Sequence, residues 1–274
     1  MDYKRKIDFA IKLLRSIPQD GPIQLSYSGG KDSDVILRLA KMAGINYRAI
    51  YKNTTIDPPG TIKHCKDNGV EILNPKHTFL ELVAKNGRPT RFSRYCCKEL
   101  KEYKVLDRAI LGIRREESAK RAKRYKEPEF CYLYSKKEKV RIYLPILEWT
   151  KEDVARFIEE ESIQCHPLYY DGEGKFCPER RLGCIGCPLR SDNGVADYLK
   201  YPKLLMQIIK ALNRFLDTHP DSKSAHKFKT GYDVIYMQLF CDNYEQYQEQ
   251  VTGGLFPDMA IDPEKFIKEY FKID

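Results

Sequence analysis

The feature that most constrains the fold is a glycine turn between a strand-like segment and a helix-like segment. Residues 23–28 are predicted to form a strand and residues 34–43 a helix, and the turn between them carries Gly29, Gly30 and Lys31. Backbone N–H groups of such a turn converge with the unpaired N–H groups of the first helical turn, where the helix dipole is positive. The sequence therefore predicts a loop that binds phosphate groups.

The side chains of this turn suit an anion. Gly29 and Gly30 permit positive φ and a close approach of the backbone to a ligand, and Lys31 adds a point charge. A Walker A loop is excluded, because it needs a glycine at the position of Leu25. The alternative is an ordinary Gly-Gly turn with a solvated lysine, which the flanking strand, helix and hydroxyl groups disfavour. The predicted binding residues of the loop are Ser26, Ser28, Gly29, Gly30, Lys31, Asp32 and Ser33.

The remaining periodic segments follow the order of an α/β fold. Strand, helix and strand at this spacing form a parallel βαβ unit, and from residue 192 onward only helical spacing is found. We expect a parallel sheet flanked by helices in residues 1–190 and a helical C-terminal extension in residues 191–274. Besides the two segments above, helices are predicted at 5–16, 61–68 and 150–161, and strands at 47–51, 70–73, 106–112 and 140–144; Thr150 and Asp153 are predicted to form a capping box.

The length, amino-acid composition and net charge of the chain indicate its general class of protein. A chain of 274 residues that is 42% hydrophobic and 32% charged can bury one substantial core and a smaller appended unit. It contains no apolar run long enough to cross a bilayer, and its first residues carry charges of both signs, so a cytoplasmic location without a membrane partner is predicted. The net charge of +9 favours acidic partners such as nucleotides or nucleic acid, but it fits equally well with lysine-rich helices that only maintain solubility.

Two pairs of closely spaced cysteines stand out among the nine in the chain. Cys96 and Cys97 are adjacent, and Cys184 and Cys187 form a Cys-x-x-Cys motif, so that two loops could supply four thiolates. This set fits either tetrahedral zinc or an iron–sulfur cluster, and Cys177 is near enough in sequence to replace one ligand. The alternative is that Cys96 and Cys97 are core thiols. The other cysteines, Cys65, Cys131, Cys165 and Cys241, are predicted to be packing residues.

Four ordered segments carry a resemblance to a known family. The loop at residues 28–33 resembles the pyrophosphate-binding loop of the ATP-pyrophosphatase (PP-loop) superfamily, and residues 112–118, 145–154 and 166–184 resemble segments of its phosphoadenosine phosphosulfate (PAPS) reductase-like family. The resemblance implies a Rossmann-like parallel sheet, an adenine nucleotide at the carboxyl ends of the strands, and sulfur chemistry. It also favours a 4Fe-4S cluster at Cys96, Cys97, Cys184 and Cys187, with zinc as the alternative.

The resemblance assigns three further residues to the nucleotide site. Gly112 and Arg114 belong to a Gly-x-Arg-x-x-x-Ser segment that lies beside the nucleotide in the family, and an arginine can hold phosphate oxygens by paired hydrogen bonds. Asp57 follows the second strand and is a candidate for contact with magnesium or ribose. The basic run 120–124 is either a surface for a larger acidic acceptor or a solvated helix with i,i+4 ion pairs. Trp149 and His166 are predicted to be architectural.

Three functions remain open at this point. The first is an ATP-dependent sulfur-transfer enzyme, in which the loop and magnesium hold the leaving pyrophosphate and Lys31, Asp32 and Arg114 are catalytic. The second is a PAPS or adenylyl-sulfate reductase, whose family pattern includes a C-terminal Cys-Gly-Leu-His-like segment, whereas Cys241 is followed by Asp242. The third is a non-catalytic regulator that binds a nucleotide or nucleic acid. The sulfur acceptor (RNA, DNA or a small molecule) and a sulfur-donor protein are not specified by the sequence.

Overall fold

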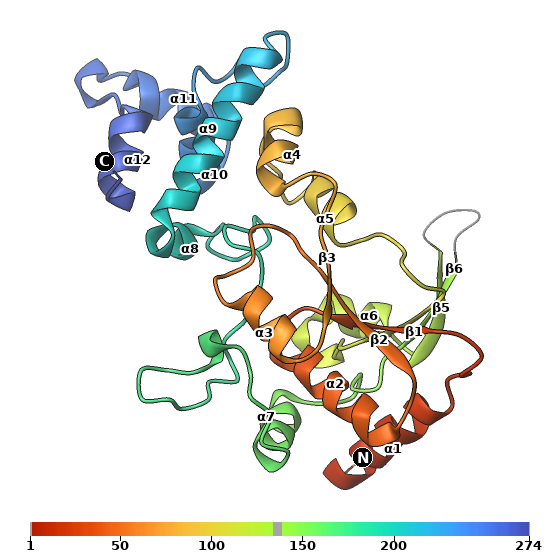
Figure 1. The fold of residues 1–274 in the computed structure, drawn as a ribbon. Coiled ribbons are helices and arrows are strands. Elements are labelled where there is room, and N and C mark those ends of the chain that lie inside the picture. The colour runs from red at the N-terminus through yellow and green to blue at the C-terminus, as the bar shows by residue number, and fades with distance from the viewer. Residues whose placement is uncertain (1, 134–138, 274) are drawn as a thin grey trace. The chain divides into compact units, whose positions relative to one another are not determined.

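The computed structural model describes residues 2–133 and 139–273, which divide into two compact units (Figure 1). The first unit comprises Met1–Asn53, Asp57–Pro75 and Lys101–Gly183, and the second comprises Thr54–Ile56, Lys76–Leu100 and Cys184–Asp274. This division differs from a single boundary after residue 190, because two helices from the middle of the chain share a core with the C-terminal helices. These helices are α4 (Phe79–Asn86) and α5 (Tyr95–Leu100).

A six-stranded sheet forms the centre of the first unit, in the order β3-β2-β1-β4-β6-β5. All neighbouring strands are parallel except β5, which pairs with β6 in the antiparallel sense. The five predicted strands are present, whereas β5 was not predicted. The strands are β1 (Ile23–Tyr27), β2 (Tyr47–Lys52), β3 (Glu71–Leu73), β4 (Arg108–Leu111), β5 (Glu129–Leu133) and β6 (Lys139–Tyr143).

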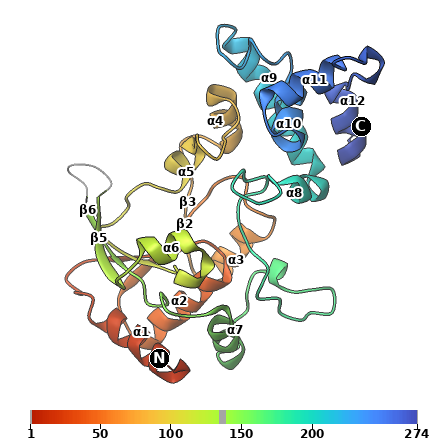
Figure 2. The ribbon, with the colours of Figure 1, turned by 180° about the vertical axis from the view of Figure 1, so that it is seen from behind.

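One face of the sheet is covered by three helices that carry the main core. These are α1 (Tyr3–Arg15), α2 (Lys31–Ala43) and α7 (Lys151–Glu160), of which α2 contacts both others (Figure 2). Leu14 of α1, Leu25 of β1 and Phe157 of α7 are almost fully buried in this core. Trp149 is buried there too, with its ring centroid 5.3 Å from that of Phe157, so the prediction that it is architectural is consistent with its packing.

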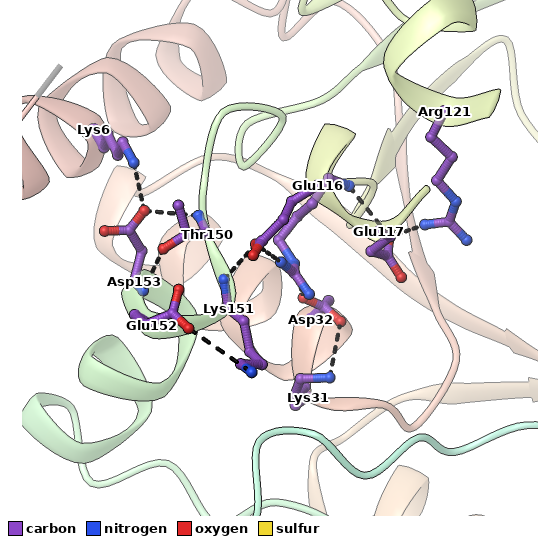
Figure 3. A network of polar contacts seen from close by, with 11 residues as sticks. Lys6, Lys31, Asp32, Glu116, Glu117, Arg121, Thr150, Lys151, Glu152 and Asp153 are labelled. Atoms are coloured by element: carbon purple, nitrogen blue, oxygen red, sulfur yellow. Dashed lines mark hydrogen bonds and ion pairs between the residues drawn. The ribbon is translucent and has the colours of Figure 1, made fainter. Parts of the chain in front are cut away.

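The start of α7 is fixed by a local capping box and by an ion pair with α1. Thr150 and Asp153 form the predicted capping box, in which each side chain accepts a hydrogen bond from the other residue's backbone N–H. The Asp153 carboxylate also pairs with Lys6 of α1 (Figure 3). The same capping residues therefore fix the start of α7 and join α7 to α1.

The other face of the sheet carries a smaller core and an open cavity. Successive strand residues point to opposite faces, so Ile110 joins the main core while Ala109 packs with Val140 and Ile142 on the other side. The connections of this unit also include α3 (Thr61–Asp67), α6 (Ala119–Arg124) and the 3-10 turns η1 (Arg115–Glu117) and η2 (Pro167–Tyr169).

The second unit is helical in its described part, as predicted for the C-terminal region. Its helix α9 packs against α4 and α10, and α10 packs against α12. No helix in the described ranges is long and apolar enough to cross a membrane. Besides α4 and α5, the helices are α8 (Val195–Lys200), α9 (Pro202–Thr218), α10 (Gly231–Phe240), α11 (Tyr244–Thr252) and α12 (Pro263–Phe271), with the turn η3 (Pro257–Met259).

Candidate active site

The predicted phosphate loop joins β1 to α2 in a fixed conformation. Gly29 has a φ of 76°, and a Cβ added there would lie 3.1 Å from the Leu182 side chain, so the position requires glycine for two reasons. Gly30 is the N-cap residue of α2. The Ser33 hydroxyl donates to the Gly30 carbonyl at 2.6 Å, and the Gly30 N–H donates to the Ser28 hydroxyl at 3.3 Å. These bonds hold the backbone donors of the helix start around one point.

The end of β4 approaches this loop closely. A Cβ on Gly112 would stand 2.9 Å from the backbone oxygen of Asp32, so only glycine lets the strand reach the first turn of α2. Two residues later, the Arg114 guanidinium donates to the Asp32 carboxylate at 2.6 Å and to Glu116 at 2.9 Å. Asp32 also pairs with the Lys31 ammonium at 3.6 Å (Figure 3). Asp32 therefore holds both predicted cations in place, and each of these cations is about 95% buried.

These residues line a cavity of about 260 Å³ that is predominantly cationic. Four cations face it, Lys31, Arg114, Arg121 and Arg181, against two carboxylates. Burial lowers the pKa of Lys31, and repulsion from Arg114 and Arg181 lowers it further, while Asp32 opposes the shift. An anion placed among these cations would relieve that repulsion. The other lining residues are Ser26, Ser28, Gly30, Asp32, Ser33, Gly112, Glu117, Tyr169 and Leu182.

Two of the cations were not assigned to the site from the sequence. Arg121 forms the i,i+4 pair with Glu117 that the solvated-helix alternative predicts, yet it also lines the cavity, which neither alternative for residues 120–124 specified. Arg181 is exposed and has no acidic partner among the residues that the structure describes. Its position directly before the Leu-Gly-Cys segment was the only sequence signal that could have indicated it.

A second cavity, of about 310 Å³, lies along the open face of the sheet. Residues of β1, β2, β4 and β6 line it, among them Ser26, Ile50, Ala109 and Ile142. It shares four lining residues with the cationic cavity, so the two spaces adjoin. The shared residues are Ser26, Ser28, Gly112 and Leu182.

Several polar groups also line this second cavity, among them Asp57 and the lysines Lys52, Lys101 and Lys104. Asp57 lines it and accepts a hydrogen bond from the Tyr51 hydroxyl. Lys52 packs its ammonium 4.0 Å from the centre of the Tyr103 ring and donates to the Lys101 carbonyl at 2.9 Å, and burial lowers its pKa to about 8. A mainly apolar cavity that also carries polar groups, next to a cationic one, fits a ligand that has a flat ring at one end and phosphates at the other.

The four cysteines of the predicted cluster all belong to the second unit. The pKa of Cys96 is raised by a hydrogen bond with Cys97, by burial and by the neighbouring Cys184, so these three thiols lie close together. Cys187 lies on the turn that begins at Cys184. Within the described ranges, no three histidine, cysteine or acidic side chains are arranged so that they could hold a metal ion. The thiols are therefore neighbours without forming a closed ligand set.

Hydrogen bonds from one arginine join the two cysteine-bearing segments. The Arg91 guanidinium donates to the Pro188 carbonyl at 2.9 Å and to the Arg190 carbonyl at 2.8 Å, which joins the segment before Cys96 to the segment after Cys187. Multiple hydrogen bonds from one guanidinium fix the relative position of two loops.

A buried arginine lies in the same unit as both cysteine pairs and contacts the ring of Tyr198. Arg88 is 9% exposed, its Nη1 atom has no hydrogen-bond partner, and no carboxylate pairs with it in the described ranges. Burial raises the pKa of Tyr95 and that of Tyr198; the charge of Arg88 opposes both rises, while Cys96 adds to the first and Asp197 and Cys187 add to the second. A buried cation without an acidic partner is costly, so negative charge on these thiols would stabilise it. The residue types here, four thiols and a buried cation in one unit, therefore suit metal-bound thiolates, although in the described ranges the thiols do not form a closed ligand set.

The turn within the Cys-x-x-Cys motif gives a stability prediction. Gly186 has a φ of 65°, and a Cβ there would stand 2.1 Å from the hydroxyl of the buried Tyr198. We expect Gly186→Ala to lower the free energy of unfolding by about 3 kcal/mol, the sum of overpacking and left-handed strain. Urea denaturation would measure it. The control is Gly183→Ala, where a Cβ would meet nothing within 4 Å; equal stability of the two variants would contradict the prediction.

Comparison with known proteins identifies the family. The sequence pattern of the phosphoadenosine phosphosulfate reductase domain matches residues 22–190. The chain belongs to this family. Its resemblance to the family over about residues 20–190 is thereby confirmed, as is the mostly parallel α/β fold.

The individual relatives have low sequence identity to this chain and are longer than it. An uncharacterized protein of Methanocaldococcus jannaschii is 32% identical over 211 residues, which cover 70% of this chain and 48% of that protein. Sulfate adenylyltransferase subunit 2 of Agrobacterium fabrum is 29% identical over 202 residues, covering 60% of this chain and 62% of that protein. The chain therefore spans less than two thirds of the length of these relatives.

Solved structures show more remote similarity. The phosphoadenylyl-sulfate reductase of Candida auris is 14% identical with a TM-score of 0.45, over 66% of this chain and 93% of that one. The FMN adenylyltransferase of Candida glabrata is 16% identical with a TM-score of 0.46, over 67% of this chain and 62% of that one.

The cysteines outside the two pairs differ in their surroundings. Cys65 and Cys165 are buried in the core, as predicted, whereas Cys131 is exposed on the edge strand β5, so its prediction as a packing residue was wrong. Cys241 is half-buried, with its Sγ 3.2 Å from Gln250 Oε1, and burial raises the pKa of its thiol. Cys177 belongs to the first unit, where its Sγ lies 3.5 Å from the Lys175 carbonyl oxygen.

His166 begins the segment 166–184 that resembles the family, and its contacts are those of a buried capping residue. It is fully buried, and its Nδ1 accepts a hydrogen bond from the Leu168 N–H at 3.1 Å, which caps η2. Burial, together with the nearby His64, lowers the pKa of His166 to about 4. Its contacts agree with the prediction that it caps or packs.

This lowered pKa predicts a pH dependence of stability. In the unfolded chain His166 takes up a proton near pH 6.5, but in the folded chain only near pH 4. The free energy of unfolding should therefore fall as the pH drops from 6.5 to 4, by about 3 kcal/mol in total from this residue. Urea denaturation across this range would show the slope, and His166→Asn, which keeps an acceptor for the cap, should reduce it. An unchanged slope in the variant would contradict the prediction.

Proposed function

We propose that this protein uses ATP to adenylate an acceptor, releasing pyrophosphate, and thereby prepares the acceptor for sulfur transfer. The single observation that carries the proposal is the junction of the cationic cavity with the apolar cavity along the sheet. A nucleoside triphosphate is the ligand class that fits both spaces at once. The sulfate adenylyltransferase subunit 2 relatives support an adenylyl-transfer reaction in this family.

In the proposed reaction, an acceptor oxygen forms a bond to the α-phosphorus of ATP. The bond from that phosphorus to the oxygen bridging to the β-phosphorus breaks, and pyrophosphate leaves with the electron pair. The proton of the acceptor passes to water. A sulfur nucleophile from a donor then displaces AMP from the adenylated acceptor.

The residues of the cationic cavity supply what this reaction needs. Negative charge grows on the β- and γ-phosphates as the bond breaks, so fixed cations lower the barrier. We assign this role to Lys31, Arg114 and Arg181, with the backbone N–H groups of the loop. Asp32 positions the first two cations, Asp57 is assigned to a ribose hydroxyl of the substrate, and magnesium would arrive bound to the phosphates.

We further propose that Cys96, Cys97, Cys184 and Cys187 hold a 4Fe-4S cluster, with zinc as the alternative occupant. Their proximity and the unpartnered charge of Arg88 support thiolate ligands. When bound, such a cluster would supply electrons or a site for sulfur during transfer.

A sulfonucleotide reductase is the second candidate, because the family bears that name. The reductase reaction needs a reactive cysteine nucleophile, and a raised pKa leaves less thiolate at neutral pH. Cys241, the cysteine of the C-terminal region outside the cluster, has such a raised pKa. This disfavours the reductase reaction. The cations that line the cationic cavity disfavour the third possibility, a regulator that catalyses no reaction.

The test measures pyrophosphate release from ATP with magnesium, with separate additions of sulfate, transfer RNA and duplex DNA as acceptors. Stimulation by one acceptor, with a matching formation of AMP-linked product, is the expected result and identifies the acceptor. Sulfite release from PAPS with thioredoxin, and no release of pyrophosphate from ATP under any condition, would replace the proposal with the reductase.

A further inference from the structure

Tyr169 stands against the phosphate loop, although the sequence indicated no role for it beyond architecture. It ends the turn η2 and is 3% exposed. The Lys31 ammonium lies 5.3 Å from the centre of its ring, and a Cβ added to Gly30 would be 3.3 Å from its hydroxyl oxygen. The Tyr169 side chain also lines the cationic cavity. The hydroxyl is therefore at the boundary between the loop backbone and the space for the anion.

The hydrogen bonding of this hydroxyl leaves its proton unused. Its oxygen accepts from the Leu182 N–H at 3.3 Å. A phenol also carries one O–H donor, which this bond does not engage. In the part of the chain that the structure describes, no acceptor is found for the O–H group itself. The proton is thus available to a ligand.

The charge state of the phenol is fixed as well. Burial raises the pKa of Tyr169 to about 12, so the hydroxyl stays protonated at neutral pH. A neutral O–H whose oxygen is held by the Leu182 N–H donates to an anionic oxygen in a short, charge-assisted bond. Such a donor adds to affinity without adding to the repulsion among the four cations of the cavity.

We propose that Tyr169 is a binding residue of the phosphate site, whose hydroxyl donates a hydrogen bond to the bound pyrophosphate group. The inference rests on the proposed function, because it takes the cationic cavity to be the site of the β,γ-phosphates. It goes further in giving the cavity a neutral, directional donor beside the helix start, provided by a turn about 140 residues away in the chain.

The test compares the binding of inorganic pyrophosphate to the wild-type protein, Tyr169→Phe and Tyr170→Phe by calorimetry. Tyr170 is the matched control, since its hydroxyl accepts from the Cys165 N–H at 3.1 Å and does not line the cavity. We expect Tyr169→Phe to weaken binding about 10- to 100-fold, the loss of a hydrogen bond to a charged group, and Tyr170→Phe to stay within about twofold. Equal affinities of the two variants would overturn the inference.

A second measurement keeps the test valid if Tyr169→Phe does not fold. With 3-fluorotyrosine incorporated at position 169 the hydroxyl is retained and becomes a more acidic, stronger hydrogen-bond donor, so pyrophosphate should bind more tightly than to the wild type. A role in packing alone predicts an unchanged affinity, which would overturn the inference while leaving the proposed function intact. Failure of the wild-type protein to bind pyrophosphate at all would overturn both.

Discussion

Lys31→Met is expected to reduce pyrophosphate release from ATP by about 100- to 1,000-fold, the cost of removing one fixed group that stabilises charge on the leaving phosphates. Methionine retains most of the side-chain volume, which matters because Lys31 is 5% exposed. Burial and two neighbouring cations lower the pKa of Lys31 in the protein without ligand, so its charge is unfavourable for folding. The variant should therefore lose activity without losing stability.

Two measurements separate this result from simple misfolding. The thermal midpoint of Lys31→Met should equal or exceed that of the wild type, and its affinity for pyrophosphate should fall together with the rate. Lys41→Met is the matched control, since Lys41 lies exposed in the last turn of the same helix. A Lys31→Met protein that turns over ATP within a few-fold of the wild type would refute the assignment of the leaving-group site.

Cys184→Ser is expected to abolish stoichiometric metal binding by the second unit. The wild-type protein, purified without oxygen, should contain iron and acid-labile sulfide, about four of each per chain for a 4Fe-4S cluster. Serine removes one thiolate from a set in which Cys96, Cys97 and Cys184 are neighbours. Because the binding energy of a structural metal contributes to folding, the variant should also unfold more easily.

Elemental analysis and the visible absorption spectrum would check this prediction, with Cys177→Ser as the control. Cys177 belongs to the first unit and should leave the iron content unchanged. Zinc in place of iron would assign the alternative metal and remove the redox role. A wild-type protein with neither metal would refute the cluster and leave Arg88 without its proposed counter-charge.

Much of the fold follows from short-range patterns in the chain. The glycine turn after β1, the strands at residues 47–52 and 139–143 and the Thr150 cap of α7 all depend on residues within a few positions of each other. Strand β5 escaped prediction because it is a short antiparallel partner at the edge, whose pairing with β6 no local pattern specifies.

The residues of the candidate site likewise divide into those that local sequence patterns indicated and those that they did not. Lys31, Asp32 and the glycines of the loop could be assigned from the sequence, because the helix start and its turn are contiguous. Arg181 and Tyr169 could not, since they enter the cavity only when residues 166–183 pack against the loop. Their residue types are common on any surface, and only position relative to the loop gives them a role.

The sequence by itself therefore determined the family, the parallel sheet, the phosphate loop and the two cysteine pairs, since each is encoded by neighbouring residues or by an ordered set of motifs. Only the tertiary structure decided that the cationic cavity adjoins the cavity along the sheet, that Arg88 is buried in the unit of the cysteine pairs, and that helices α4 and α5 belong with the C-terminal unit. The physical reason is that burial, charge repulsion and shared hydrogen bonds act between residues far apart in the chain. Their partners are set by packing and not by spacing along the sequence.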